Sequence, residues 1–254
     1  MNEIRNLSEL YRIFEKGNNK RISYFRGQAS DWPLLPSIAR PTVTDEERLR
    51  EKEYYRRLAA FLPSSNDWEI ATIAQHYKIP TRLIDWSENP LVAAYFAVSD
   101  REFDHDDGVI WFFEDRTGVA GNRASIHDSD EVWGNRHYPD GKERRVRGLN
   151  YPRPYRAWKD LQYKIPRTIA QRGSLTSQPD LYKTFDLQVT DDKTQSCEKF
   201  IVPKSAKHHL RRQLEVSGIT TERLFPDYLE TGTGNPMDLI GDCMRIRCEI
   251  FNAS

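Results

Sequence analysis

The fold is decided by residues 74–97, which read AQHYKIPTRLIDWSENPLVAAYFA. Apolar residues recur three and four positions apart at Ile70, Ile73, Ala74 and Tyr77, which predicts an amphipathic helix that leads into this stretch. Pro80 cannot continue that helix and ends it. The segment that follows, 81–86, is predicted as a short strand or turn.

The second half of the stretch predicts a buried helix. Asn89 followed by Pro90 is typical of a helix cap and the first helical position. Residues 91–98 are apolar nearly all round, so we expect their helix to be buried. Because strands and helices mix along the chain without strict alternation, we expect an α+β fold with a mixed, mostly antiparallel sheet flanked by helices.

Other patterns predict further elements of both kinds. Helical spacing or capping residues predict helices over 3–16, 44–62 and 205–216. Short apolar or alternating runs predict strands at 22–25, 109–113, 167–176, 185–189, 199–202 and 246–250.

The chain divides into three parts on these patterns. Residues 1–21 form an N-terminal helix, 22–230 one domain, and 231–254 a C-terminal strand extension packed on that domain. Within the domain, glycines and prolines punctuate residues 114–160, which we expect to be an irregular insertion.

Composition excludes several classes of protein. The 254 residues include 38 basic and 38 acidic side chains, so the net charge of zero argues against binding nucleic acid by bulk charge alone. No run of about 18 apolar residues predicts a membrane helix, and the first 17 residues carry no secretory signal. Three cysteines without such a signal are typical of reduced thiols, so we expect a cytoplasmic protein with no membrane partner.

Motifs for common cofactors do not occur. The chain contains no GxxxxGK[ST], GxSxG or HExxH pattern. His105 and His127 each stand among acidic residues, but side chains adjacent in an extended loop point in different directions. We therefore expect no metal site.

Phe25-Arg26-Gly27 places an arginine at the end of a predicted strand. A guanidinium there suits bidentate contact with a phosphate or a carboxylate. Two interpretations stay open: Arg26 binds a ligand, or it is a structural arginine paired with Asp85.

Polar residues also gather inside the stretch that decides the fold. Because they lie between two apolar helices, they require a hydrogen-bond network. They are Gln75, His76, Thr81, Arg82, Asp85 and Ser87. His76 is interpreted either as a base or nucleotide contact, or as a structural histidine.

The chain resembles the FRG domain family, which is typical of bacteria and phages. The matching pieces run in order from about residue 22 to 230. They are YFRGQ at 24–28, WPLLPS at 32–37 with Arg40, QHYKIPTRLIDWS at 75–87, Asn89-Pro90, AYFA at 94–97, RTIAQRG at 167–173 and LFPD at 224–227.

A second resemblance is to ADP-ribosyltransferases. Arg26 with Gly27 is similar to the first motif of that group, which holds NAD, and residues 87–97 are similar to its second. The third motif, a glutamate that engages the nicotinamide ribose, is matched in order by Glu198, whereas Gln171 occupies the late FRG-type motif. The resemblance implies an ADP-ribosyltransferase-like fold and a reaction with NAD, or a nucleotide-binding relative without catalysis.

This resemblance assigns roles to particular residues. Arg26 with Gly27 holds the phosphates, while Asp85 and Ser87 shape the pocket that Gln75, His76 and Arg82 support. The candidates for catalysis are Glu198, Gln171 and His76, and the flat nicotinamide ring packs on Tyr77, Trp86 or Tyr95. The acceptor is a nucleic acid or a protein.

The alternative class is a non-catalytic module that binds nucleic acid or protein. Residues 142–159 hold seven basic side chains against a single acidic one, with aromatic residues interleaved, which suits single-stranded nucleic acid. The contact residues of this interpretation are Arg144, Arg145, Arg147, Tyr151, Arg153, Tyr155 and Arg156. Lys204, Lys207, Arg211 and Arg212 are predicted to add a basic helix face.

Overall fold

A computed structural model describes residues 2–15, 22–45, 48, 67–76, 79–115, 153–156, 166–178, 180–189 and 195–226. The predicted elements at 44–62 and 246–250, apart from Thr44, Asp45 and Arg48, lie outside these residues, as does most of the insertion at 114–160.

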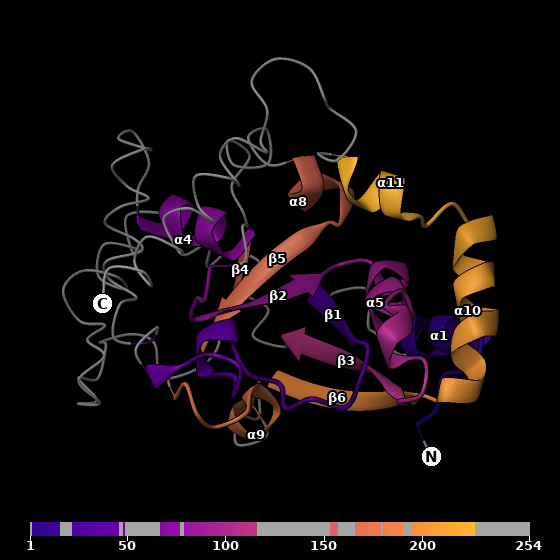
Figure 1. Ribbon diagram of the computed structural model, residues 1–254, viewed down its shortest axis with the longest axis horizontal. Coiled ribbons are helices and arrows are strands. Elements are labelled where there is room, and N and C mark those ends of the chain that lie inside the picture. Colours follow the sequence, from indigo (N-terminus) through magenta and orange to yellow (C-terminus); the bar gives the residue numbers. More distant parts are fainter. Residues whose placement is uncertain are drawn as a thin grey trace.

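One six-stranded sheet organises the described residues (Figure 1). Its order is β4-β5-β2-β1-β3-β6, and every pair of neighbouring strands is antiparallel. A single parallel bridge, Glu3 to Ile201, adds the N-terminal residues beside β6. The strands are β1 (Ile22–Gln28), β2 (Leu83–Ser87), β3 (Gly108–Asp115), β4 (Arg153–Arg156), β5 (Gly173–Ser177) and β6 (Gln195–Val202).

Helices and short 3-10 turns complete the α+β fold that the sequence predicts. The α-helices are α1 (Leu7–Glu15), α4 (Asp67–His76), α5 (Pro90–Val98), α8 (Pro166–Ala170), α9 (Phe185–Val189), α10 (Lys204–Val216) and α11 (Thr221–Leu224). The 3-10 turns are η1 (Ser37–Ala39) and η2 (Arg101–Phe103).

The two faces of the sheet carry separate hydrophobic cores. Helices α1, α5 and α10 lie together on one face (Figure 1), where their apolar residues pack on Phe25, Phe112 and Phe200. The other face packs aromatic residues, among them Tyr24 and Trp111, against α9. Because successive side chains of a strand point to opposite faces, the alternation of Tyr24 and Phe25 serves both cores.

Helix α5 is the buried helix that the sequence predicts. The side chain of Asn89 accepts a hydrogen bond from the backbone nitrogen of Leu91 at 3.0 Å, with Pro90 at the first helical position. The cap therefore forms as expected.

Helix α5 lies directly on the backbone of β1. A Cβ atom at Gly27 would stand 1.8 Å from the carbonyl oxygen of Ala93 and 2.8 Å from the backbone nitrogen of Ala97. Backbone atoms cannot yield at such distances, so only a residue without a side chain fits at position 27.

Lys207 of α10 connects three segments instead of facing solvent. It is 1% exposed, and its Nζ donates to the carbonyl oxygens of Ala29 at 2.7 Å and Phe103 at 2.5 Å. Burial lowers the pKa of Lys207. Arg211 is also engaged, since it donates to Asp104 and to the carbonyl oxygen of Val98. The predicted basic face of this helix is thus wrong in part: Lys204 and Arg212 are exposed, whereas the other two residues hold the fold together.

Two predicted strands are also corrected. Residues 185–189 form α9, because Phe185 and Val189 are four positions apart and pack together on one helical face. Within 167–176, the chain first forms α8 and enters β5 only at Gly173. Short apolar runs fit either element, and packing on the sheet decides between them.

Replacing Gly27 with alanine should lower the free energy of unfolding by at least about 3 kcal/mol, because α5 must move off β1 to admit the methyl group. Urea unfolding measures this loss. Gly173→Ala is the matched control: the nearest atom to its Cβ would be a side-chain methyl, Thr168 Cγ2, at 3.3 Å, so we expect a change below about 1 kcal/mol. Equal losses in the two variants would contradict the close approach of α5.

Candidate functional site

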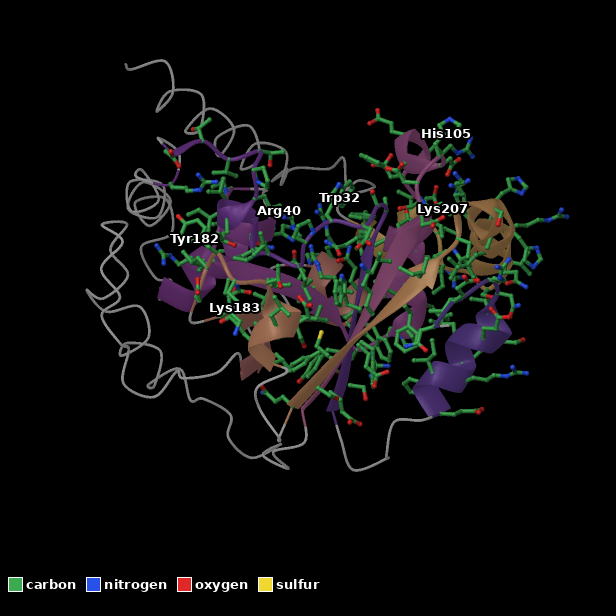
Figure 2. All side chains as sticks on the ribbon, turned by 90° about the horizontal axis from the view of Figure 1, so that it is seen from below. Trp32, Arg40, His105, Tyr182, Lys183 and Lys207 are labelled. Carbon is green, nitrogen blue, oxygen red and sulfur yellow. The ribbon has the colours of Figure 1, made fainter. Side chains whose placement is uncertain are left out.

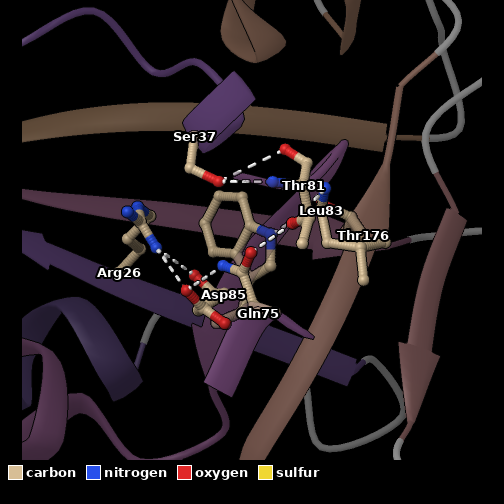
Figure 3. A network of polar contacts seen from close by, with 8 residues as sticks. Arg26, Ser37, Gln75, Thr81, Leu83, Asp85 and Thr176 are labelled. Carbon is tan, nitrogen blue, oxygen red and sulfur yellow. Dashed lines mark hydrogen bonds and ion pairs between the residues drawn. The ribbon is translucent and has the colours of Figure 1, made fainter. Parts of the chain in front are cut away.

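The side chains of Arg26 and Asp85 meet where two neighbouring strands separate. Strands β1 and β2 share one register pair, Phe25 with Ser87, whereas β1 pairs with β3 along its whole length. In that gap, Arg26 Nη1 donates to the carbonyl oxygen of Asp85 at 2.8 Å (Figure 3). The same nitrogen lies 3.7 Å from Asp85 Oδ2, which is an ion pair beyond hydrogen-bond distance.

The Asp85 carboxylate is bonded to α4 instead. Gln75 Nε2 donates to Asp85 Oδ2 at 2.5 Å, and Thr81 Oγ1 donates to Gln75 Oε1. Thr81 also accepts a hydrogen bond from the backbone nitrogen of Leu83 at 3.2 Å. Ser37 of η1 holds the Thr81 backbone through its hydroxyl, which accepts from Thr81 N at 2.9 Å. The network that the sequence requires is therefore present around Gln75, Thr81 and Asp85 (Figure 3).

Positive charge exceeds negative charge at this point. Burial and the nearby Arg40 together lower the pKa of Arg26 to about 10, while Asp85 opposes both effects. Burial also lowers the pKa of Arg40, and Asp85 again opposes the shift. Arginine side chains keep their positive charge in proteins, so two positive charges share one carboxylate here. We call Arg26, Arg40 and Asp85 the arginine cluster.

Exposure distinguishes the three members of the arginine cluster. The Arg26 side chain is 14% exposed, its Nε atom is buried without a hydrogen-bond partner, and Arg40 is half-buried. The Asp85 side chain is 55% exposed. The structural pair of Arg26 with Asp85 that the sequence suggests therefore exists. Its carboxylate faces solvent instead of lying in the core.

Ser87 connects this region to the residues before β5. Its Oγ atom donates to the carbonyl oxygen of Gln171 at 2.6 Å and accepts from the backbone nitrogen of Asn89 at 2.9 Å. The Gln171 side chain points to α11, since its Nε2 donates to the carbonyl oxygen of Leu224 at 3.1 Å. The structure thus brings Ser87 and Gln171 together. The side-chain amide of Gln171 is already bonded to the backbone of Leu224.

Glu198 does not join them. In the sheet, Phe25, Phe112 and Glu198 stand in one row across β1, β3 and β6, whereas Arg26 stands in the next row with Trp111. Side chains in adjacent rows point to opposite faces. The carboxylate of Glu198 therefore lies on the other face of the sheet from Arg26, two strands away.

The remaining predicted residues are placed as follows. Trp86 is 3% exposed and its indole nitrogen donates to Thr176 Oγ1 at 2.8 Å, so it is part of the core and offers no face to a nicotinamide ring. Tyr95 is half-buried and bonds Thr221 through its hydroxyl. His76 is the last residue of α4 and Arg82 directly precedes β2, and both are half-buried. Tyr77 lies outside the described residues.

The sequence alone did not assign a role to Arg40. It appeared among the residues that match the FRG pattern, but no local signal connects it with Arg26, which lies fourteen positions earlier. Its position is set by η1: the hydroxyl of Ser37 in this turn bonds Thr81, and Arg40 follows at the end of the turn.

The basic segment of the alternative interpretation is largely outside the described residues. Within it, the backbone of residues 153–156 forms β4, which pairs with β5 at one end of the sheet order. Binding of nucleic acid or protein by Arg144, Arg145, Arg147 and Tyr151 stays a prediction.

Hollows elsewhere on the surface lie away from the arginine cluster. Two open hollows of about 380 and about 680 Å³ share Asp107 and Ile201, and His105, which lines the smaller one, is well apart from Arg40 (Figure 2). Among the described residues, His, Cys, Asp and Glu side chains form no group of three that could hold a metal ion. None of the described helices is long and apolar enough to cross a membrane.

The fold and the site define an α+β domain with an antiparallel sheet. Its partly buried arginine cluster lies where strands β1 and β2 separate. The FRG domain family model matches residues 21–106, so this part of the chain is an FRG domain. The matched range holds β1, β2 and α5 and every member of the arginine cluster. No curated protein and no solved structure matches the chain.

Ser87→Ala should lower the free energy of unfolding by about 1–3 kcal/mol, because the backbone nitrogen of Asn89 and the carbonyl of Gln171 lose a buried partner. Thermal and urea unfolding measure the change. The control is Ser217→Ala, where an exposed hydroxyl donates to Gln213, and there we expect at most about 0.5 kcal/mol. A neutral Ser87→Ala would show that this connection does not stabilise the domain.

Proposed function

We propose that the FRG domain binds NAD or a related nucleotide, with its phosphates on Arg26 and Arg40. The observation that carries this proposal is the charge of the arginine cluster: two guanidinium groups share one half-exposed carboxylate. A partly buried cation without a full counter-charge attracts an anion, because its own hydration has already been reduced.

The hydrogen-bond geometry supports the same class of ligand. Arg26 donates to a backbone carbonyl and stands 3.7 Å from the carboxylate, so no bidentate pair occupies its planar fork. Phosphate oxygens match such a fork in spacing and charge. The two strand ends that resemble the NAD-binding motifs, at Arg26 and at 85–87, are also neighbours in the sheet.

Beyond binding, we propose that the domain transfers ADP-ribose from NAD to an acceptor. Such a transfer breaks the bond between the ribose and nicotinamide and joins the ribose to an acceptor, which gives up a proton. A carboxylate beside the ribose assists it. Because Glu198 lies on the other face of the sheet, Asp85 is the carboxylate that the arginine cluster offers for this role.

Calorimetric titration with NAD and with ADP-ribose tests the binding. We expect Arg26→Ala and Arg40→Ala each to weaken binding by at least about tenfold, the effect of losing one charge-assisted contact. Arg212→Ala, which removes an exposed arginine on α10, is the matched control and should bind as the unmodified protein does. Equal affinity in all three variants, or no binding to either ligand, would contradict the proposal.

Release of nicotinamide from NAD tests the transfer separately. We expect a slow release by the unmodified protein, and its loss in Asp85→Asn with nucleotide binding retained. A protein that binds NAD without releasing nicotinamide, with or without added protein and nucleic-acid acceptors, would be a nucleotide-binding module.

A further inference from the structure

We propose that Gln75, oriented by Thr81, is a positioning residue that holds the Asp85 carboxylate away from Arg26 and so keeps the Arg26 guanidinium open to a phosphate. This inference rests on the proposed function, because it explains why the Asp85 carboxylate does not occupy the site on Arg26 that is proposed for a phosphate.

The first observation is that the Asp85 carboxylate bonds Gln75 and not Arg26. Its Oδ2 atom lies 2.5 Å from Gln75 Nε2 and 3.7 Å from Arg26 Nη1, so the neutral amide holds the hydrogen bond and the charged group does not (Figure 3). Carboxylates ordinarily prefer the two-pronged contact with a guanidinium, which is stronger than a bond to an amide. Something in the structure must therefore hold the carboxylate on Gln75.

The second step is the orientation of the Gln75 amide. The Thr81 hydroxyl accepts from the backbone nitrogen of Leu83 and donates its proton to Gln75 Oε1. Thr81 is fully buried, so this proton has no competing water. With the oxygen of the amide bonded to Thr81, its nitrogen faces Asp85, and the amide cannot turn without losing both bonds.

The third step is competition for Arg26. A carboxylate on the neighbouring strand is present at high effective concentration, so it would exclude an external phosphate if it were free to turn. Arg26 Nε, which is buried without a partner, shows that the guanidinium is not saturated by the protein. Holding Asp85 on Gln75 leaves the exposed part of the Arg26 guanidinium to a ligand.

The test compares single and double variants by titration with ADP-ribose. Gln75→Ala should weaken binding by about tenfold, because the released carboxylate closes on Arg26. Asp85→Asn should bind at least as tightly as the unmodified protein, because it removes the negative charge that lies 3.7 Å from Arg26 Nη1. The double variant Gln75→Ala with Asp85→Asn should recover most of the affinity lost by Gln75→Ala. Gln213→Ala on α10, which removes a remote half-buried glutamine, is the matched control and should leave the affinity unchanged.

Three outcomes would overturn the inference. Unchanged affinity in Gln75→Ala would show that Asp85 stays in place without the amide. A double variant as weak as Gln75→Ala would show that Gln75 contacts the ligand directly. Weaker binding in Asp85→Asn would show that the carboxylate supports the ligand instead of competing with it.

A second readout separates this inference from the proposed function. In the ligand-free protein, the Arg26 Nε–H resonance should shift on Gln75→Ala, as the carboxylate pairs with the guanidinium, and should return in the double variant. If the unmodified protein binds no nucleotide but this shift appears, the proposed function fails and the positioning role of Gln75 stands. If the resonance does not move, the positioning role is wrong whatever the protein binds.

Discussion

The close approach of α5 to β1 at Gly27 is the constraint on which the rest of the structure depends. A methyl group at this position would meet the Ala93 carbonyl oxygen at 1.8 Å, so the helix rests on the strand backbone itself. Helix α5 begins directly after β2, and its docking therefore also sets where β2 ends against β1. Because adjacent side chains of a strand face opposite ways, filling one face at Gly27 directs Arg26 to the other.

The arginine cluster follows from that arrangement. Strands β1 and β2 pair at one point and separate beyond it, and the separation is bridged by the Arg26 side chain and the Asp85 carbonyl instead of further strand pairing. The hydrogen bonds of Gln75 and Thr81 then tie α4 and η1 to the same place. The residues that stabilise the sheet here also place two guanidinium groups beside one half-exposed carboxylate, so the proposed nucleotide site and the structural contacts use the same side chains.

Local signals predicted most helices and strands, whereas the pairing and register of the strands could not be predicted from the sequence. The Asn89 cap and the buried helix after it are confirmed, because a cap and a run of apolar residues act within a few positions. The helix at 185–189 was missed, because a five-residue apolar run fits either element until its packing is known. For the site, pairing of Arg26 with Asp85 was one of two interpretations left open by the sequence, and the structure shows that contact. Glu198 stood in the right order along the chain but lies in a different row of the sheet from Arg26. Register is set by long-range pairing, which sequence order does not contain.

A crystal structure of the protein with ADP-ribose tests the central claim most directly. We expect a phosphate oxygen within about 3 Å of the guanidinium nitrogens of Arg26, a second contact from Arg40, and the Asp85 carboxylate still bonded to Gln75. ADP-ribose bound elsewhere on the domain, or an Asp85 carboxylate closed on Arg26 with the ligand excluded, would contradict the assignment of the arginine cluster as the nucleotide site.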